Sequence, residues 1–321
     1  MTCINVGIIG TGKHGTRYAN HIINDLPNMR LKAISRRSPA GRQQADRWQC
    51  AYYSTWQDLV ADSRIDAVIS VVPPALNRDI AEVCCNHGKA LLMEKPLATT
   101  VSDAKAIVSM CDKTNTPLTV AQTLRYNTVI QGLVRNYPRL GTCYSFVINQ
   151  RLEPSTLAWL QDPKQAGAGV ILHTAVHLFD ALRFITGLEI RRVRAMSRMI
   201  HNPYLEDMVL AEVECDQGVT GLLDTSKISP ARTGRFEFIG QNGILSGDQI
   251  HGSLEWLHGT ERTPLPCATP GPTIVNLLED WYNFLCNSEK NPIDGLEGLS
   301  AVRACEACLK SARSGTWEQV I

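Results

Sequence analysis

The sequence predicts an α/β protein with two domains: a parallel sheet covered by helices, then an α+β domain with a large, mostly antiparallel open sheet. Over the first third of the chain, nearly continuous apolar runs alternate with helical patterns, which is typical of a parallel sheet buried on both faces. From about Thr142 onward, strands of alternating polarity follow one another across tight turns, which favours an antiparallel sheet with one buried face. We expect the first domain to span residues 1–121 and the second residues 122–321.

Each expected element follows from its own pattern. Thr100, followed three residues later by Asp103, is a typical helix start. Apolar runs predict strands at 4–10, 31–35, 67–72, 90–94 and 118–122, with helices at 14–25, 39–50, 54–62, 77–88 and 100–115. Strict alternation predicts the later strands at 142–151, 190–199, 208–215, 219–227 and 235–243, followed by a proline-rich loop at 263–273 and helices at 274–287 and 299–315.

Bulk composition narrows the class of protein. The 321 residues are 44% hydrophobic and 20% charged with net charge +1, which is typical of a globular protein and gives no electrostatic footprint for nucleic acid. No apolar run reaches membrane-spanning length, and the apolar N-terminal run leads directly into a glycine-rich turn. We therefore expect a cytoplasmic protein without a signal peptide or a membrane partner. Among the eleven cysteines, Cys305 and Cys308 have CxxC spacing, but their apolar helical context favours packed thiols.

A glycine-rich motif directly follows the first expected strand. Gly10, Gly12 and Gly15 form GxGxxG between a strand and a helix, which is the context that the Rossmann dinucleotide motif requires. The first glycine permits the tight turn, the second lets the backbone approach a pyrophosphate, and the third allows close helix packing. The N–H groups of the helix N-terminus would face the phosphates. We expect the cofactor to contact Gly10, Thr11, Gly12, Lys13, His14 and Gly15.

The end of the second expected strand predicts which dinucleotide binds. NAD-binding proteins usually carry Asp or Glu there, whereas this chain has Ser35 followed by Arg36 and Arg37. A carboxylate would repel a 2′-phosphate, but a hydroxyl and two guanidinium groups would hold it. The sequence therefore predicts NADP in preference to NAD, and a solvated basic loop is the alternative interpretation.

Four stretches together resemble the Gfo/Idh/MocA oxidoreductases, a family that includes glucose-fructose oxidoreductase and inositol dehydrogenase. They are VGIIGTGKHG, VVPPALNRDIAEVCCNHGKALLMEKPL, GAGVILHTAVHLFDALRFITG and NPIDGLEGLSAVRACEACLKSARSG, and they span nearly the whole chain. The resemblance implies a Rossmann domain and then an α/β domain whose open sheet commonly forms the interface of dimers or tetramers. It also implies hydride transfer between a nicotinamide cofactor and a secondary alcohol or ketone of a sugar, nucleotide sugar or cyclitol.

The resemblance implies roles for individual residues. Lys95 matches the family's EKP lysine, which contacts the reacting oxygen and the nicotinamide ribose, and the peptide bond before Pro96 is commonly cis in relatives. His177 matches the catalytic histidine. The remaining matches are Arg125 and Tyr126, which line the substrate site in relatives, and Pro73 and Glu94, which fall at the cofactor site. Asn77 departs from the family pattern, because relatives frequently carry histidine there, and it is also expected at the cofactor site.

Two histidines four residues apart, His173 and His177, lie on one face of an expected helix. We expect His177 to accept the substrate's hydroxyl proton and Lys95 to stabilise charge on the oxygen. Relatives usually carry Asp or Asn at position 173 and glycine at position 175, where this chain has His173 and Ala175. We expect His173 to hold a second hydroxyl or to tune His177, with a core role as the alternative. Trp159 is expected either to stack on a sugar ring or to serve the core.

Three other interpretations are weaker. A metal site built from His173, His177 and Asp180 lacks the intervening Glu of an HExxH motif and has few N or S ligands, so we expect none. A non-enzymatic NADP(H)-binding sensor would not need Lys95 and His177. NAD-dependent glycoside cleavage, which is known among relatives, stays open because position 173 departs from the family pattern.

Overall fold

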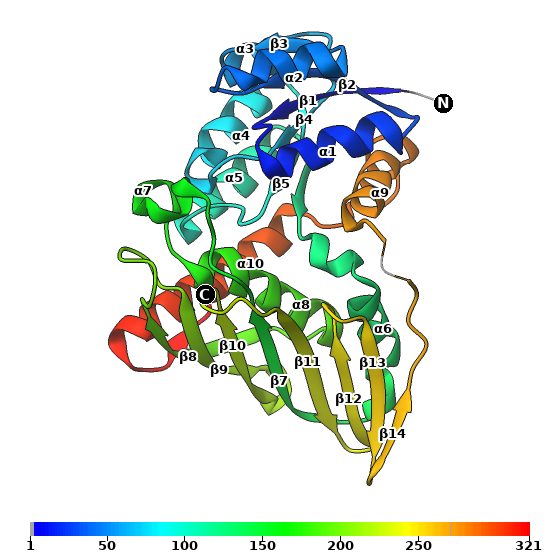
Figure 1. The fold of residues 1–321 in the computed structure, drawn as a ribbon, viewed down its shortest axis with the longest axis vertical. Helices are drawn as coiled ribbons and strands as arrows, with labels where there is room; N and C mark the ends of the chain where they lie inside the picture. Colours follow the sequence, from blue (N-terminus) through cyan, green and yellow to red (C-terminus); the bar gives the residue numbers. More distant parts are fainter. Residues whose placement is uncertain (1–2, 270) are drawn as a thin grey trace. The chain divides into compact units, whose positions relative to one another are not determined.

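The computed structural model describes residues 3–269 and 271–321. The first two residues of the expected first domain and position 270 of the expected proline-rich loop lie outside the described residues. The chain divides into two compact units, residues 1–122 with 272–299 and residues 123–271 with 300–321 (Figure 1). The sequence interpretation placed 272–299 in the second domain. The structure groups this segment with the first unit, and a Cβ at Gly295 or Gly298 would meet the side chains of Leu118 or Val120.

The first unit contains a six-stranded sheet in the order β3-β2-β1-β4-β5-β6, with every neighbouring pair parallel. This is the strand order of a doubly wound dinucleotide-binding fold. The strands are β1 (Ile4–Ile9), β2 (Met29–Ser35), β3 (Ala51–Tyr53), β4 (Ala67–Ser70), β5 (Ala90–Glu94) and β6 (Leu118–Ala121). The five predicted strands are confirmed, and β3 is an additional edge strand of three residues.

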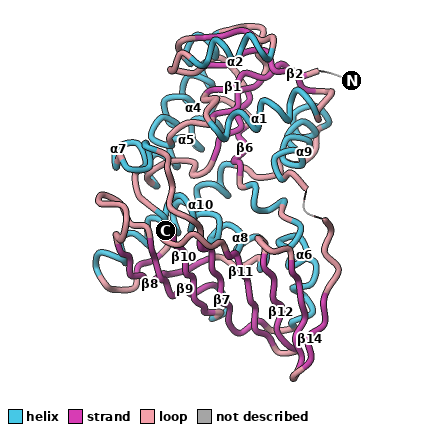
Figure 2. Tube along the Cα trace, in the orientation of Figure 1, coloured by secondary structure: helices cyan, strands magenta, loops and turns pink. Residues whose placement is uncertain are grey.

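Helices alternate with these strands along the chain, as Figure 2 shows. They are α1 (Lys13–Asn24), α2 (Ala40–Trp48), α3 (Trp56–Ala61), the 3-10 turn η1 (Pro74–Leu76), α4 (Asn77–Asn86), α5 (Val101–Lys113) and the later α9 (Thr273–Asn287). The predicted cap of α5 is present, because the Thr100 hydroxyl accepts a hydrogen bond of 3.1 Å from the Asp103 amide. The carboxyl ends of β1, β2, β4 and β5 therefore open into short loops at one edge of the sheet.

The second unit contains a nine-stranded sheet in the order β14-β13-β12-β11-β7-β10-β9-β8-β15. All its pairs are antiparallel except β7 with β10, which are parallel. The five predicted strands are β7 (Cys143–Arg151), β8 (Ile190–Arg198), β9 (Met208–Cys215), β10 (Thr220–Ser226) and β11 (Thr233–Gly240). The strands not predicted are β12 (Gly243–Asp248), β13 (Ser253–His258), β14 (Glu261–Pro264) and β15 (Glu318–Gln319).

Helical elements precede, connect or follow the strands of this unit, and the longest of them pack on one face of its sheet. They are η2 (Thr123–Tyr126), α6 (Thr128–Asn136), η3 (Tyr137–Leu140), η4 (Ala158–Gln161), α7 (Pro163–Ala166), the π-helical turn η5 (Ile171–Ala175), α8 (Val176–Thr186), η6 (Asp216–Gly218) and most of α10 (Gly295–Ser314). Phe146 and Ile148 of β7 are buried against the helices, whereas Val147 between them is exposed. Cys305 and Cys308 are fully buried in α10, which confirms the packed-thiol prediction.

No apolar run of membrane-spanning length was expected from the sequence, but one helical stretch among the described residues, Pro163–Thr186, is long and apolar enough by length and composition to cross a membrane. Most of its apolar window, 78%, is buried inside the structure, as expected for a core helix that packs against the sheet.

Candidate active site

The turn between β1 and α1 has the geometry that the glycine motif predicts. Gly10 has φ +90°, and a Cβ there would lie 2.2 Å from the Val71 carbonyl oxygen. A Cβ at Gly15 would lie 2.0 Å from the Gly10 carbonyl oxygen, so both positions need glycine for packing. A Cβ at Gly12, in contrast, would meet no atom within 4 Å. The open space over Gly12 is what a closely approaching ligand requires.

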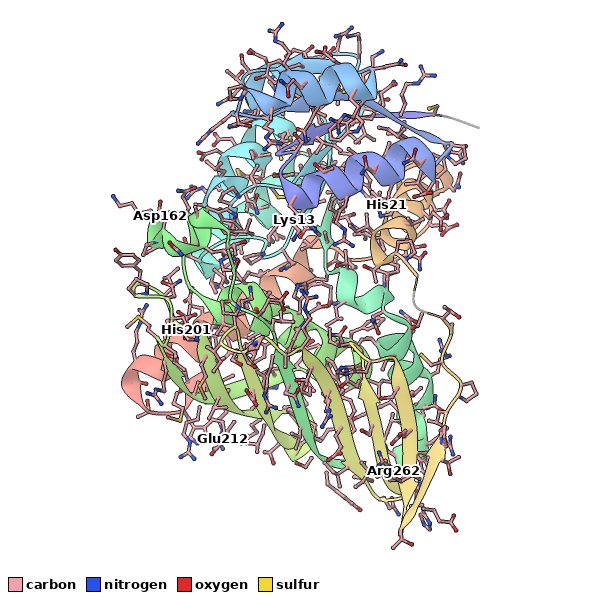
Figure 3. All side chains as sticks on the ribbon, viewed as in Figure 1. Lys13, His21, Asp162, His201, Glu212 and Arg262 are labelled. Atoms are coloured by element: carbon pink, nitrogen blue, oxygen red, sulfur yellow. The ribbon has the colours of Figure 1, made fainter. Side chains whose placement is uncertain are left out.

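The N-terminus of α1 is suited to an anion. Gly12 caps the helix without a side-chain hydrogen bond, and the first turn carries no acidic residue. The first N–H groups of a helix lack intrahelical partners and lie at the positive end of its dipole. Lys13, labelled at this end of α1 in Figure 3, is exposed, while Thr11 is buried. The turn therefore fits a dinucleotide pyrophosphate, with backbone donors and a cation beside them.

The end of β2 carries the residues predicted to select the cofactor. Ser35 is buried, and its carbonyl accepts the Gly10 amide at 2.9 Å. Arg36 turns back to the glycine motif and donates to the Thr11 carbonyl at 2.8 Å and to Gln44 Oε1 at 3.0 Å. Arg37 is exposed. Gln44 is a residue that sequence reasoning missed, because nothing in helix 40–48 shows that its amide meets a loop more than thirty positions earlier.

The loops after β4 and β5 contact each other. Pro73 precedes the 3-10 turn η1, and Asn77 behind it is buried. The Asn77 amide donates to the carbonyls of Pro96 and Leu97 at 3.3 and 3.1 Å. The Asn77 side chain was predicted to contact the cofactor, but in the structure it supports the loop of residues 94–97, the EKP loop. The Lys95–Pro96 peptide bond is cis, as expected.

Glu94 was also predicted at the cofactor site, but the structure buries it and surrounds it with protein donors. Tyr18 Oη donates to Glu94 Oε1 at 2.6 Å, and His14 Nε2 lies 2.7 Å from the same oxygen. Glu94 Oε2 accepts the backbone amide of Lys95 at 3.2 Å. Burial alone would raise the pKa of Glu94, but the hydrogen bonds and the nearby positive charges lower it below its usual range. Glu94 is therefore an anion at neutral pH, and Lys95 beside it is half-buried.

In the second unit, Arg125 is held by a carboxylate. Its guanidinium donates to both oxygens of Asp180, at 2.9 and 2.6 Å, and both side chains are buried. It also lies 4.9 Å from the ring centroid of Phe184. This fork-to-fork pairing positions Arg125 within the unit and differs from the substrate contact that the sequence predicted. Tyr126, next in the chain, is half-buried.

The two histidines occupy different kinds of helix. His173 lies in the π-helical turn, where it is buried, and His177 lies half-buried in the first turn of α8. His173 Nε2 lies 2.9 Å from the Ala166 carbonyl oxygen, and its ring meets Trp159 edge-on at 5.2 Å between centroids. These contacts favour the core role for His173, and they place Trp159 beside it. π-helical turns are rare and frequently occur at functional sites.

Glu206 holds the start of this turn, and sequence reasoning missed it. Its Oε1 accepts the amides of Gly169 and Ile171 at 2.8 and 3.2 Å. Burial raises the pKa of Glu206, although these amides oppose the shift. A Cβ at Gly169 would lie 1.8 Å from the Glu206 carbonyl oxygen, so the two backbones are in close contact.

A cavity of about 220 Å³ lies beside His173 within the second unit. Its polar lining includes Gln161, His201, Asn202, Glu206, Asp207 and Lys227. Among the residues that the structure describes, no group of three or more His, Cys, Asp or Glu side chains converges as metal ligands would. The cavity offers amide, imidazole and ammonium groups, which pair with hydroxyl groups.

Two protein-family models match this chain, one in each structural unit. The model described as "Oxidoreductase family, NAD-binding Rossmann fold" matches residues 4–122, and the "GFO/IDH/MocA C-terminal domain" model matches residues 139–246. The chain belongs to the Gfo/Idh/MocA oxidoreductase family. Family membership makes it an oxidoreductase that binds a nicotinamide cofactor, and the turn at Gly12 is where the structure fits such a group.

Relatives of this chain act on sugars and cyclitols. It is 24% identical over 259 residues to scyllo-inositol 2-dehydrogenase (NAD(+)) of Bacillus subtilis, covering 75% of this chain and 73% of that protein. It is 30% identical over 272 residues to 1,5-anhydro-D-fructose reductase of Ensifer adhaerens, covering 81% of each. The solved structure of levoglucosan dehydrogenase with NADH and L-sorbose matches the full length of both chains with a TM-score of 0.89 at 20% identity, a likeness that shows the fold.

Proposed function

We propose that this chain transfers a hydride between a nicotinamide dinucleotide, NADP in preference to NAD, and a secondary alcohol or ketone of a sugar, nucleotide sugar or cyclitol. The observation that carries the proposal lies within one unit: the turn after β1 has space for a pyrophosphate at Gly12, and the half-buried Lys95 follows β5 of the same parallel sheet. Inositol, sugar and anhydrosugar relatives support the substrate class, and so does the polar cavity beside His173.

We propose that Lys95 and His177 perform the proton chemistry. The turn at Gly10, Gly12 and Gly15 would hold the dinucleotide, and its nicotinamide would supply the hydride acceptor for the carbinol C–H bond. The Lys95 ammonium stabilises the negative charge that develops on the substrate oxygen, and His177 accepts the hydroxyl proton. The reverse reaction returns that proton to the oxygen. Tyr126 and Trp159 contact the substrate in this proposal, whereas Arg125 and His173 hold their neighbours in place.

The cofactor preference rests on Ser35, Arg36 and Arg37. Arg36 donates hydrogen bonds to the Thr11 carbonyl and to Gln44, so its positive charge is held directly after Ser35 and beside the glycine motif. Fluorescence titration should give a lower Kd for NADPH than for NADH, and Ser35→Asp should reverse the order because a carboxylate repels the 2′-phosphate. A wild-type preference for NADH would reject the NADP assignment and leave the reaction type standing.

Turnover assays with both nucleotides and a panel of sugars and cyclitols test the roles. We expect Lys95→Ala and His177→Ala each to lower kcat by about 10²-fold or more, since general acid–base and charge-stabilising groups contribute factors of this size. Retained turnover in either variant would reject that residue's assignment. Unchanged cofactor Kd in His177→Ala would show that the loss lies in chemistry and that the fold is intact.

The location and assembly of the protein are also proposed. The cysteines are thiols, and six of them are buried as small apolar side chains, which supports a reducing, cytoplasmic environment. The sheet of the second unit exposes apolar side chains on the face away from its helices, which supports a homodimer or homotetramer formed through this sheet. They include Tyr144, Val147, Met196, Leu210 and Leu222.

A further inference from the structure

A chain of contacts joins the phosphate-binding turn to the EKP loop inside the first unit. His14 is the residue before Gly15 of the glycine motif, and its Nε2 lies 2.7 Å from Glu94 Oε1. The other carboxylate oxygen of Glu94 accepts the Lys95 amide at 3.2 Å. One carboxylate therefore touches both the turn that would seat the cofactor and the backbone of the lysine assigned to the reaction.

The protonation states along this chain follow from its chemistry. The lowered pKa of Glu94 makes it a carboxylate, which only accepts hydrogen bonds. Tyr18 Oη therefore donates to it, and His14 Nε2 must carry the proton that lies between the imidazole and Oε1. Tyr18 is fully buried and its ring meets the His14 ring edge-on, with centroids 5.5 Å apart. The imidazole is thus fixed by a carboxylate on one side and an aromatic ring on another.

Only His14 among these three residues is exposed enough to be covered by a bound cofactor. Glu94 and Tyr18 are buried, but 42% of the His14 side chain is exposed at the N-terminus of α1. A ligand on this turn would cover His14 and exclude water from its hydrogen bond with Glu94, and such bonds strengthen when water is excluded. The EKP loop would then be held most firmly when the cofactor is in place.

We propose that His14 is a positioning residue that couples cofactor binding to the placement of Lys95 through Glu94. The expected effect on kcat rests on the proposed function. The expected effect on the flexibility of the EKP loop requires only that the cofactor binds. His14 acts on Lys95 only through Glu94, so what the coupling needs at position 14 is a side-chain N–H donor at the distance of Nε2. Glutamine provides one, because its Nε2 lies the same number of bonds from Cα.

The test compares His14→Ala with His14→Gln, and uses His21→Ala as the matched control. His21 is a second histidine of α1, and its Nδ1 lies 2.7 Å from Asp25 Oδ2. It lies toward the other end of α1 from the glycine motif (Figure 3). The kinetic readout is kcat and KM for the best substrate at saturating NADPH or NADP⁺. We expect His14→Ala to lower kcat about tenfold with little change in KM, as a small misplacement of a reacting group does. His14→Gln should recover most of this loss, and His21→Ala should match the wild type.

The second readout is hydrogen–deuterium exchange of the peptide that contains Glu94–Ala98, with and without NADPH. In the wild type and in His14→Gln, NADPH should slow exchange in this peptide. In His14→Ala, NADPH should still protect the glycine turn but should leave the EKP peptide as it is without ligand.

The outcomes separate this inference from the proposed function. Wild-type behaviour of His14→Ala in both readouts overturns the coupling, and so does an equal kcat loss in His14→Ala and His14→Gln, because the donor would then be irrelevant. If the wild type shows no turnover on any substrate, the proposed function fails, and the exchange measurement alone decides whether His14 couples the two loops.

Discussion

Arg125 and Asp180 illustrate what a single buried pair does in this protein. Both oxygens of Asp180 accept from the guanidinium, and the Asp180 side chain has no exposed surface. Removing one member of a buried ion pair leaves the other charge without compensation. We expect Asp180→Asn to lower the free energy of unfolding by about 3 kcal/mol in urea denaturation. Glu189→Gln breaks the more exposed pair with Arg183 and should cost no more than about 1 kcal/mol. Equal effects of the two changes would contradict this ranking.

Glu206 predicts an unusual pH dependence of stability. Burial raises the pKa of Glu206 in the folded state, so the folded protein binds the carboxyl proton more tightly than the unfolded chain does. The carboxyl group therefore costs no stability below its unfolded pKa, and its cost grows as the pH rises toward the folded pKa. Both amide bonds go to Oε1, which glutamine keeps. We expect Glu206→Gln to raise Tm above that of the wild type at neutral and higher pH, and the gap to close near pH ~4.

The control for this change is Glu289→Gln, at an exposed position after α9. It should leave Tm within error of the wild type across the same pH range. A loss of stability in Glu206→Gln at neutral and higher pH that disappears near pH ~4 would contradict this expectation, because it would show that the turn that carries His173 needs the charge at position 206.

Individual site residues were predictable where their signal is local. The glycine spacing, Ser35 with the following arginines, and Lys95 before Pro96 are each readable within a few positions of the chain. The partners of these residues were not, because His14 and Glu94 are 80 positions apart and only the sheet brings them together. Asn77 shows the same limit, since its position near the site was foreseen but its bonds to the EKP loop were not.

The turn between β1 and α1 needs glycine for two different reasons, one for packing within the protein and one for access of a ligand. A Cβ at Gly15 would collide with the Gly10 carbonyl, whereas a Cβ at Gly12 would enter open space. We expect Gly15→Ala to lower the free energy of unfolding by at least about 1 kcal/mol, because the backbone must shift to admit the methyl group. Gly12→Ala should leave stability within about 0.5 kcal/mol of the wild type.

The same pair of variants should separate folding from ligand binding. Gly12→Ala should weaken NADPH binding by about tenfold, or about 1.4 kcal/mol, since its methyl group occupies the space where the pyrophosphate approaches. Fluorescence titration measures this. Unchanged NADPH affinity in a stable Gly12→Ala protein would mean that the cofactor does not contact this turn.

Element prediction succeeded where hydrophobic periodicity is strong. The parallel strands are buried on both faces, and their apolar runs identify them without tertiary information. Strand β14 has every side chain exposed and β15 has only two residues, so neither shows apolar alternation. Strand β12 was missed because its pattern GILSGD begins with Gly243 and is interrupted by Gly247. The π-helical turn before α8 was also not foreseen, because its amides are held by Glu206, more than thirty positions later.

At the scale of the whole molecule, the open sheet predicts self-association. Exposed Met196, Leu210 and Leu222 lie on strands β8 to β10, with ion pairs such as Arg194–Glu212 beside them. An exposed apolar face with ion pairs beside it could pack against the same face of a second copy of this chain, as in a two-fold symmetric dimer. We expect Leu222→Lys to lower the sedimentation coefficient toward that of a monomer, with an unchanged circular dichroism spectrum.

The matched control is Ile23→Lys, which alters a similarly exposed apolar side chain on α1 in the other unit. It should sediment like the wild type. If both variants and the wild type sediment alike, the sheet face is not the interface.

The central claim is that a hydride moves between a carbinol carbon and the bound nicotinamide, and isotope transfer measures this directly. The protein is incubated with NADP⁺, and in a second series with NAD⁺, together with a sugar or cyclitol that carries deuterium on its carbinol carbons. The cofactor is then recovered and examined by NMR. We expect one deuterium at C4 of the reduced nicotinamide in the wild type and almost none in Lys95→Ala or His177→Ala. Recovery of unlabelled, oxidised NADP⁺ and NAD⁺ with every substrate of the panel, from protein shown to bind the nucleotide, would contradict it.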